Sequence, residues 1–376
     1  MNQVNYSQIA ANLYSQNIFV MNRACKFIYT SLHELNTHAS SIRPLKNNFV
    51  RMKAKRYIII IVLLFLFSKS QAQQEVLYTE YVFSQLAVNP ACAGNDEGLS
   101  LTALSRKQWF GLQGSPTSFS FLGQGLVNNK KSECRALSGG SDKRGLSPID
   151  NKQVGLGLVV FNDQVGVSNT LISSISYSYK IQFSHGKRLS FGLQGSMLNY
   201  SQSFNQLDNP NTSDPVFVDN VHVLRFNAGG GLFYETNHYY LGFSVPQILE
   251  NSLNPNSEND KTLRQYFFTG GYVFYLNRFY KFKPTFMVRY TNGLPPQFDI
   301  NANFLYRDKL WLGCSYRYTN SLNAYLELLI SDNFRMGVAY DYPISEINKV
   351  AHGSAEIMIN YIFLKSKKRV SNPRYF

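Results

Sequence analysis

The sequence predicts an all-β protein, a transmembrane outer-membrane β-barrel of about 14 antiparallel strands. Three observations lead to this class: apolar and polar residues alternate, the alternating segments are about ten residues long, and a secretory signal precedes them. The clearest segment, Gln297–Tyr306, sets Phe298, Ile300, Ala302, Phe304 and Tyr306 against Gln297, Asp299, Asn301 and Asn303. A period of two gives a strand one apolar face and one polar face.

Segments with this pattern follow one another along the chain, separated by short polar turns. One of the longest runs through Ile175, Tyr177 and Tyr179, which alternate with serines. In chain order, the expected strands are 99–109, 117–125, 153–163, 168–183, 188–204, 221–235, 238–246, 264–277, 282–291, 297–306, 309–319, 322–331, 333–342 and 353–363.

A soluble β-sandwich would also alternate, so the pattern alone leaves two architectures open. The strand length favours the membrane, because a tilted transmembrane strand needs about 9–11 residues. The polar faces are mostly Ser, Thr, Asn, Gln and Gly, and tyrosines such as Tyr340 and Tyr342 stand near strand ends, as in the aromatic girdles of barrels. A bilayer forces the sheet to close, since an open edge would leave backbone groups unpaired in hydrocarbon.

Residues 51–74 have the three parts of a secretory signal: a basic start, an apolar run at 57–67, and small residues at Ser70-Gln71-Ala72. The apolar run is too short for a membrane helix of about 20 residues, although a short membrane anchor is the alternative. The expected organisation is an upstream over-extension at 1–51, a signal peptide at 52–72, an N-terminal periplasmic segment at 73–98, the barrel at 99–364 and a basic C-terminal tail at 365–376.

The basic charge lies mostly outside the expected barrel. The full chain has a formal net charge of +14, from 37 Lys/Arg and 23 Asp/Glu. Residues 1–72 hold nine of these bases and one acid, and residues 365–376 hold five bases and no acid, so residues 73–364 carry only +1. A nucleic-acid-binding protein spreads its basic excess over one face. We therefore expect no nucleic-acid partner.

No group of residues after position 72 suggests catalysis or metal binding. The histidines His185, His222, His238 and His352 stand singly in or beside turns, and Cys92, Cys134 and Cys314 lack metal-type spacing. The string FGLQGS occurs at 110–115 and 191–196 but is not a nucleophile elbow. Gly229-Gly230-Gly231 is not followed by the Lys-Ser/Thr of a phosphate loop. We expect a protein that is not an enzyme and uses no cofactor.

Several longer motifs stand in one order along the chain. Residues 79–94 are TEYVFSQLAVNPACAG, residues 106–118 are RKQWFGLQGSPTS, residues 154–166 are VGLGLVVFNDQVG and residues 334–345 are FRMGVAYDYPIS. With this order the sequence resembles the PorP/SprF family of type IX secretion system outer-membrane proteins, found in the Bacteroidetes. The resemblance runs from about residue 78 to residue 376.

The resemblance singles out a set of residues with a structural or partner-binding role. They are Tyr81, Phe83, Asn89, Pro90, Gly94, Arg106, Gln108, Trp109, Asn162, Asp163 and Asp341. Two positions depart from the family pattern: Cys92 stands where an aromatic residue is usual, and Ala355-Glu356 stands where a His-Glu pair is common. The second departure puts any role of that pair in doubt.

The resemblance implies a non-enzymatic component of a secretion machine in the cell outer membrane. Its implied partners are outer-membrane lipid, the periplasmic ring and peptidoglycan-associated lipoprotein of the machine, and secreted cargo, including gliding adhesins, with a type IX C-terminal domain. The basic tail is a candidate partner-binding element, with Lys365, Lys367, Lys368, Arg369 and Arg374. The alternatives are a small-solute or apolar-ligand porin or transporter of the same architecture, and a barrel hydrolase.

Two further expectations concern the barrel itself. If both chain ends lie in the periplasm, connections after odd-numbered strands face outward and are longer. Connections 206–220, 247–263 and 343–352 agree, whereas 126–152 does not, which indicates either a strand miscount or a periplasmic feature. The small neutral lumen-facing residues favour a narrow or occluded interior. If Ala302 faces lipid, replacing it by Arg should cost about 2–4 kcal/mol of stability. If Asn301 faces the lumen, replacing it by Arg should cost much less.

Overall fold

The computed structural model describes residues 85–127 except 97, 152–183, 186–203, 220–253 and 261–363. Within these ranges no helix is both long and apolar enough to cross a membrane. The expected over-extension, signal peptide and basic tail lie outside the described residues.

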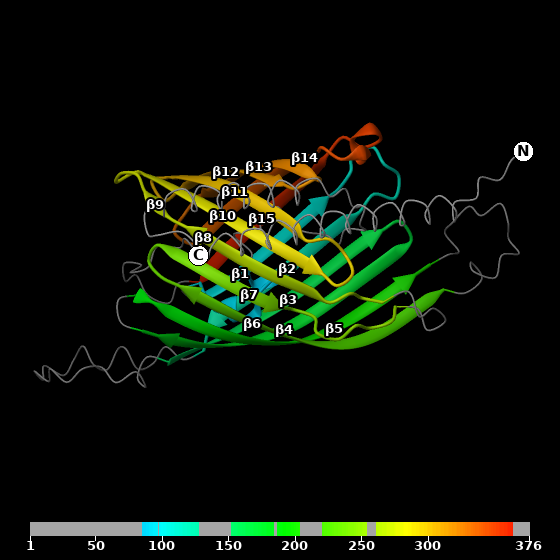
Figure 1. Ribbon diagram of the computed structural model, residues 1–376, viewed down its shortest axis with the longest axis horizontal. Coiled ribbons are helices and arrows are strands. Elements are labelled where there is room, and N and C mark those ends of the chain that lie inside the picture. Colours follow the sequence, from blue (N-terminus) through cyan, green and yellow to red (C-terminus); the bar gives the residue numbers. More distant parts are fainter. Residues whose placement is uncertain are drawn as a thin grey trace, which may run out of the picture. The chain divides into compact units, whose positions relative to one another are not determined.

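The described strands form one antiparallel sheet that closes on itself (Figure 1). In chain order they are β1 (Leu99–Lys107), β2 (Thr117–Leu126), β3 (Lys152–Val165), β4 (Ser168–Gln182), β5 (Arg188–Gln202), β6 (Val221–Glu235), β7 (Tyr239–Val245), β8 (Gln265–Tyr272), β9 (Phe274–Tyr275), β10 (Tyr280–Thr291), β11 (Gln297–Tyr306), β12 (Leu310–Arg317), β13 (Ser321–Leu329), β14 (Phe334–Pro343) and β15 (Ser354–Phe363). Apart from β8 and β9, which both pair with β10, each strand pairs with its neighbours in the sequence, and β1 pairs with β15 to close the ring.

The strand count agrees with the prediction. Both β8 and β9 pair with β10, and only Val273 separates them, so they are two parts of one wall strand. The described residues therefore form a closed 14-stranded barrel. The connection 126–152 joins β2 to β3, which are paired as expected, so its length does not come from a miscounted strand.

The barrel has two different ends. At the loop end, β1 connects to β2 through 108–116 and β14 connects to β15 through 344–353. At the turn end, short turns connect β6 to β7 at 236–238 and β11 to β12 at 307–309.

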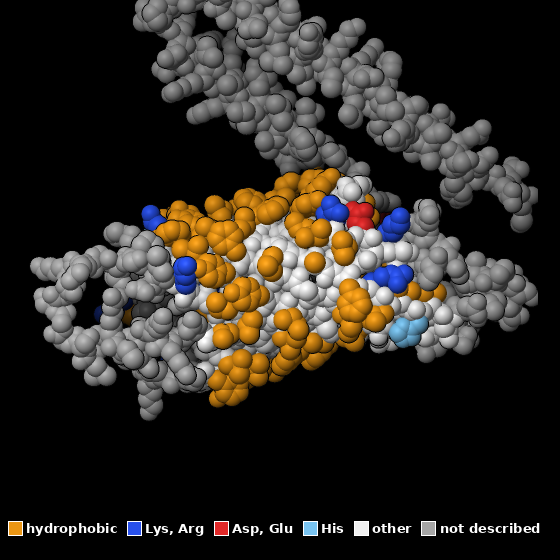
Figure 2. All heavy atoms as spheres, turned by 90° about the horizontal axis from the view of Figure 1, so that it is seen from below, with side chains coloured by type: hydrophobic (Ala, Val, Ile, Leu, Met, Phe, Trp, Pro, Cys, Tyr) orange, Lys and Arg blue, Asp and Glu red, His pale blue; other side chains and the backbone are white. Residues whose placement is uncertain are grey.

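Side chains divide between an apolar outer face and a mostly polar interior. On β11, Phe298, Ile300 and Phe304 are exposed on the outside, whereas Asn301 and Asn303 are fully buried inside, as the alternation predicted. Figure 2 shows the hydrophobic side chains that cover one face of the wall. Outer-membrane barrels present such an apolar band to lipid.

The interior is packed. Large inward side chains of the described strands, among them Met287, Trp311 and Tyr325, are almost completely buried. Residues 85–96, part of the segment expected ahead of the barrel in the periplasm, also lie inside the wall. The first short 3-10 helix is η1 (Gln85–Ala87) and the second is η2 (Pro90–Cys92), which contacts β4, β5 and β6. This part of the segment 73–98 is therefore enclosed by the barrel.

Candidate functional site

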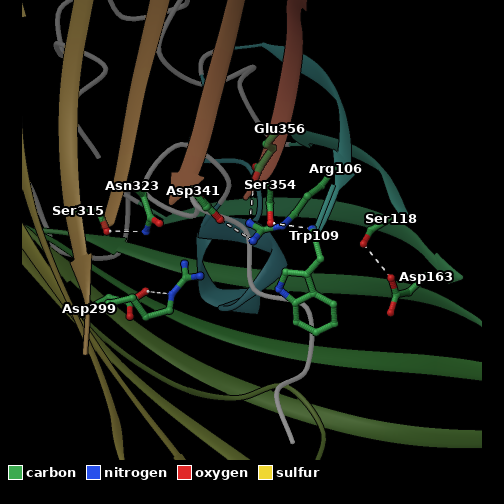
Figure 3. A network of polar contacts seen from close by, with 11 residues as sticks. Arg106, Trp109, Ser118, Asp163, Asp299, Ser315, Asn323, Asp341, Ser354 and Glu356 are labelled. Carbon is green, nitrogen blue, oxygen red and sulfur yellow. Dashed lines mark hydrogen bonds and ion pairs between the residues drawn. The ribbon is translucent and has the colours of Figure 1, made fainter. Parts of the chain in front are cut away.

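A buried ion-pair network lies inside the loop end of the barrel. Arg106, near the end of β1, donates from Nη2 to Asp341 Oδ2 at 2.5 Å and from Nη1 to Glu356 Oε2 at 3.2 Å. Asp341 is on β14 and Glu356 is on β15, so one guanidinium links three adjacent strands across the closure of the barrel. Figure 3 shows the three side chains pointing toward one another. All three are almost completely buried.

The strand register explains why these groups meet. Arg106 pairs with Glu356 in the β1–β15 ladder, and Glu356 pairs with Ala339 in the β15–β14 ladder, two residues before Asp341. Residues directly opposite on antiparallel strands point to the same face of the sheet. The alternation places this face inside, where Leu104 and Met358 are also buried.

A second ion pair lies on the neighbouring part of the wall. Arg317 Nε on β12 donates to Asp299 Oδ2 on β11 at 3.2 Å. Ser315 Oγ lies 3.3 Å from the side-chain amide of Asn323 on β13 (Figure 3). Burying a charge is expensive unless a partner compensates it. The Arg106 network and the Arg317–Asp299 pair therefore each link neighbouring strands, and the opposite charges within each offset the cost of burial.

Between these pairs the interior leaves little space. A recess at the loop end has a cavity volume of about 30 Å³, room for about two water molecules. Its lining includes Arg106, Gln108, Trp109, Arg289, Arg317 and Asp341. Within the part of the chain that the structure describes, no group of His, Cys, Asp or Glu could hold a metal ion. The recess admits water rather than a substrate.

Backbone hydrogen bonds next to the ion-pair network join two loops. The Trp109 backbone N–H donates to Ser354 Oγ at 3.3 Å, the Phe110 N–H donates to Gly353 O at 2.9 Å and the His352 N–H donates to Phe110 O at 2.9 Å. These bonds join connection 108–116 to connection 344–353 directly above Arg106. Four apolar side chains of the joined loops are exposed: Phe110, Leu112, Ile344 and Val350. We refer to these four residues as the loop ridge.

The residues singled out from the sequence separate into two groups. Arg106, Gln108, Trp109, Asp163 and Asp341 lie at the loop end. Asp163 accepts from Ser118 Oγ at 2.8 Å on the inner face of the same end.

The others lie elsewhere. Asn162 is next to Asp163 on β3 and so points to the opposite face. Asn89, Pro90 and Gly94 belong to the enclosed N-terminal segment at the turn end. Tyr81, Phe83 and the tail residues Lys365, Lys367, Lys368, Arg369 and Arg374 lie outside the described residues.

Glu356 was not among the predicted site residues. In the sequence it belongs to the Ala355-Glu356 pair, which departs from the family's His-Glu pattern, yet it is the second acceptor of the Arg106 guanidinium. Alternation along the strand indicates that Glu356 lies on the polar face. It does not indicate the partner of Glu356, because Arg106 and Glu356 are far apart in sequence and meet only when the barrel closes.

Taken together, a closed antiparallel wall, an apolar belt and a filled polar interior define an integral outer-membrane β-barrel protein. Residues 70–361 match the family model described as Type IX secretion system membrane protein PorP/SprF. The match covers more than half of the chain, which therefore belongs to this family, as its motifs predicted.

Solved structures of other barrels are distantly similar. They include the CymD monoaromatic hydrocarbon channel (TM-score 0.44, 11% identity, covering 74% of this chain and 92% of that chain). The Pseudomonas putida toluene transporter TodX has a TM-score of 0.39 at 11% identity, covering 76% of this chain and 93% of that chain. A Pseudomonas aeruginosa FadL homologue has a TM-score of 0.39 at 10% identity, covering 73% and 93%. No curated protein matches the sequence.

Proposed function

We propose that this barrel is a non-enzymatic, partner-binding component of the type IX secretion system, and that its loop end holds a secreted surface protein with a type IX C-terminal domain. The observation that carries the proposal is the loop ridge, mounted on the buried Arg106 network. A rigid base with exposed apolar side chains suits protein binding, since preorganised contacts lose little conformational entropy on association.

The orientation follows from the usual topology of such barrels. Short turns face the periplasm and longer loops face outward. The loop end then faces the cell exterior, where a secreted protein emerges, and the turn end faces the periplasmic parts of the machine. The periplasmic ring and the peptidoglycan-associated lipoprotein are the proposed partners at that side.

The filled interior argues against the alternative of a solute porin. Porins keep a polar, water-filled channel, whereas inward groups here such as Lys283 and Glu327 are almost completely buried. A barrel without a wide channel is better suited to binding than to solute passage.

The test is co-purification of cargo with the barrel. Replacing Phe110 and Val350 by Ser should reduce the cargo recovered with the barrel and displayed on the cell surface. The matched control is Ile330→Ser at the turn end, because Ile330 is 61% exposed and Val350 is 60% exposed. Equal loss of cargo in both variants, or no loss in either, would overturn the assignment of the loop ridge.

A further inference from the structure

The enclosed N-terminal segment touches the inner wall backbone to backbone. A Cβ placed on Gly192 of β5 would lie 2.1 Å from Ala91 N, and a Cβ on Gly155 of β3 would lie 2.0 Å from Ala93 O. Real Cβ atoms essentially never approach so closely, so only glycine fits at either position. The wall therefore has a groove that receives residues 85–96.

Hydrogen bonds fix the segment in this groove. They run from Ser178 Oγ to Ala93 O at 2.6 Å, from Ser244 Oγ to Val88 O at 2.6 Å, from Asn89 Nδ2 to Leu232 O at 3.0 Å and from Gly94 N to Gln124 Oε1 at 3.0 Å. Asn89 Oδ1 also accepts from Ala91 N at 3.0 Å, which caps η2. A buried backbone group without a hydrogen-bond partner is costly. These bonds supply partners to backbone groups of the segment, so an irregular segment can lie inside the barrel.

Apolar side chains of the segment extend to several sides of the wall. Leu86 packs in one cluster with Leu104, Leu122, Val159 and Met358, which come from β1, β2, β3 and β15. Val88 packs against Phe267 of β8 and Met287 of β10.

Further along the segment, Ala91 and Cys92 pack with Phe233 of β6 and Tyr240 of β7. The segment thus bridges the interior instead of lining one strand. Leu305 and Trp311 form a separate buried cluster with Val273.

We propose that residues 85–96 are a plug that seals the barrel to small solutes, and that displacing this plug opens a path for small ions through the barrel interior. The seal lets an outer-membrane barrel bind large partners without leaking. This inference concerns permeability alone and does not depend on which partner occupies the loop end.

Conductance in planar lipid bilayers tests the seal. The wild-type barrel should show no channel openings, whereas Gly192→Leu should push the plug off the wall and produce them. The matched control is Gly195→Leu on the same strand, because a Cβ on Gly195 meets nothing within 4 Å. Openings in the wild-type barrel would overturn the seal, and a folded but silent Gly192→Leu barrel would overturn the role of the plug.

A disulfide trap gives a second test that does not require a displaced plug. A Cβ on Gly157 would lie 3.1 Å from Ala93 Cβ, close to the roughly 3.5–4.5 Å Cβ separation of a disulfide. With the native cysteines replaced by Ser, Ala93→Cys with Gly157→Cys should cross-link on oxidation in the membrane, and Ala93→Cys with Gly195→Cys should not. A folded Ala93/Gly157 pair that stays reduced would show that the plug does not occupy the groove.

Discussion

Arg106 Nη2 lies 2.5 Å from Asp341 Oδ2, so a guanidinium on β1 and a carboxylate on β14 meet across β15. The contact joins the first strand of the barrel to the strand before the last, inside the loop end. It therefore fixes both the closure of the wall and the base of the loops above it.

Replacing Arg106 by Met should destabilise the barrel strongly. The change leaves Asp341 and Glu356 buried without their shared cation, and breaking a buried pair from one side costs about 3–5 kcal/mol. Urea unfolding of the barrel in lipid vesicles measures the loss. The exposed pair of Lys349 with Glu346 is the control, because Lys349→Met should change the unfolding free energy by at most about 1 kcal/mol. Equal effects of the two substitutions would contradict the assigned role of Arg106.

Replacing Ala302 by Arg should cost about 2–4 kcal/mol, because this side chain is on the outer face near the middle of β11. Ala302→Leu at the same position puts an apolar side chain into lipid and serves as the control. The measurement is refolding into lipid vesicles across a urea series. If both variants refold with the same free energy, Ala302 does not face lipid.

The companion expectation for Asn301 changes with the structure. The small cost expected for Arg there rests on Asn301 facing the lumen instead of lipid, but Asn301 is 1% exposed and its Nδ2 donates to Thr285 Oγ1 at 3.0 Å. A larger side chain in a packed site costs about 1–3 kcal/mol. Asn301→Arg should therefore also destabilise the barrel, through crowding rather than through contact with lipid.

This difference shows what alternation could and could not predict. A period of two assigned Phe298 and Asn301 to opposite faces correctly, because strand geometry is local. It could not predict what fills the interior, because the plug and its groove, such as Ala91 against Gly192, come from segments far apart in the chain. The same holds for Arg106 and Glu356, whose contact depends on the last strand pairing with the first.

The Cys92 thiol should be unreactive in the folded barrel. Burial raises the pKa of this thiol to about 12, so the reactive thiolate is scarce at pH 8. The pKa of this thiol is higher in the folded protein than in the unfolded protein. The neutral thiol therefore contributes fully to stability below about pH 9, and this contribution declines as pH rises toward 12. Mass spectrometry after maleimide treatment at pH 8 should find Cys92 unlabelled in the folded protein and labelled in urea. Equal labelling in both states would show that the plug leaves the barrel.

Cys314 provides the internal comparison for that experiment. It is exposed on the outer face of β12, whereas Cys92 is buried in the plug. In detergent micelles, Cys314 should therefore be labelled before Cys92. The opposite order would contradict the placement of residues 85–96 inside the wall.

Deleting residues 365–376 should leave an inserted barrel that no longer co-purifies with the secretion machinery. These residues follow β15, which ends at Phe363, and with the usual topology they emerge on the periplasmic side. Five bases and no acid in twelve residues suit an acidic protein surface or the anionic groups of the membrane. The alternative is a disordered tail whose terminal Phe376 serves only during insertion, and in that case deletion should remove the barrel from the membrane.

Two measurements on the tail-less protein separate these roles. Outer-membrane fractionation reports insertion, and pull-down of the periplasmic machinery reports binding. The control variant replaces the five bases Lys365, Lys367, Lys368, Arg369 and Arg374 by Gln and keeps Phe376, so it removes the charge while keeping the terminal aromatic residue. Under the binding hypothesis this variant inserts and loses its partners, because the attraction is electrostatic and should also weaken with added salt. A tail-less barrel that inserts and exports cargo at wild-type levels would exclude both roles.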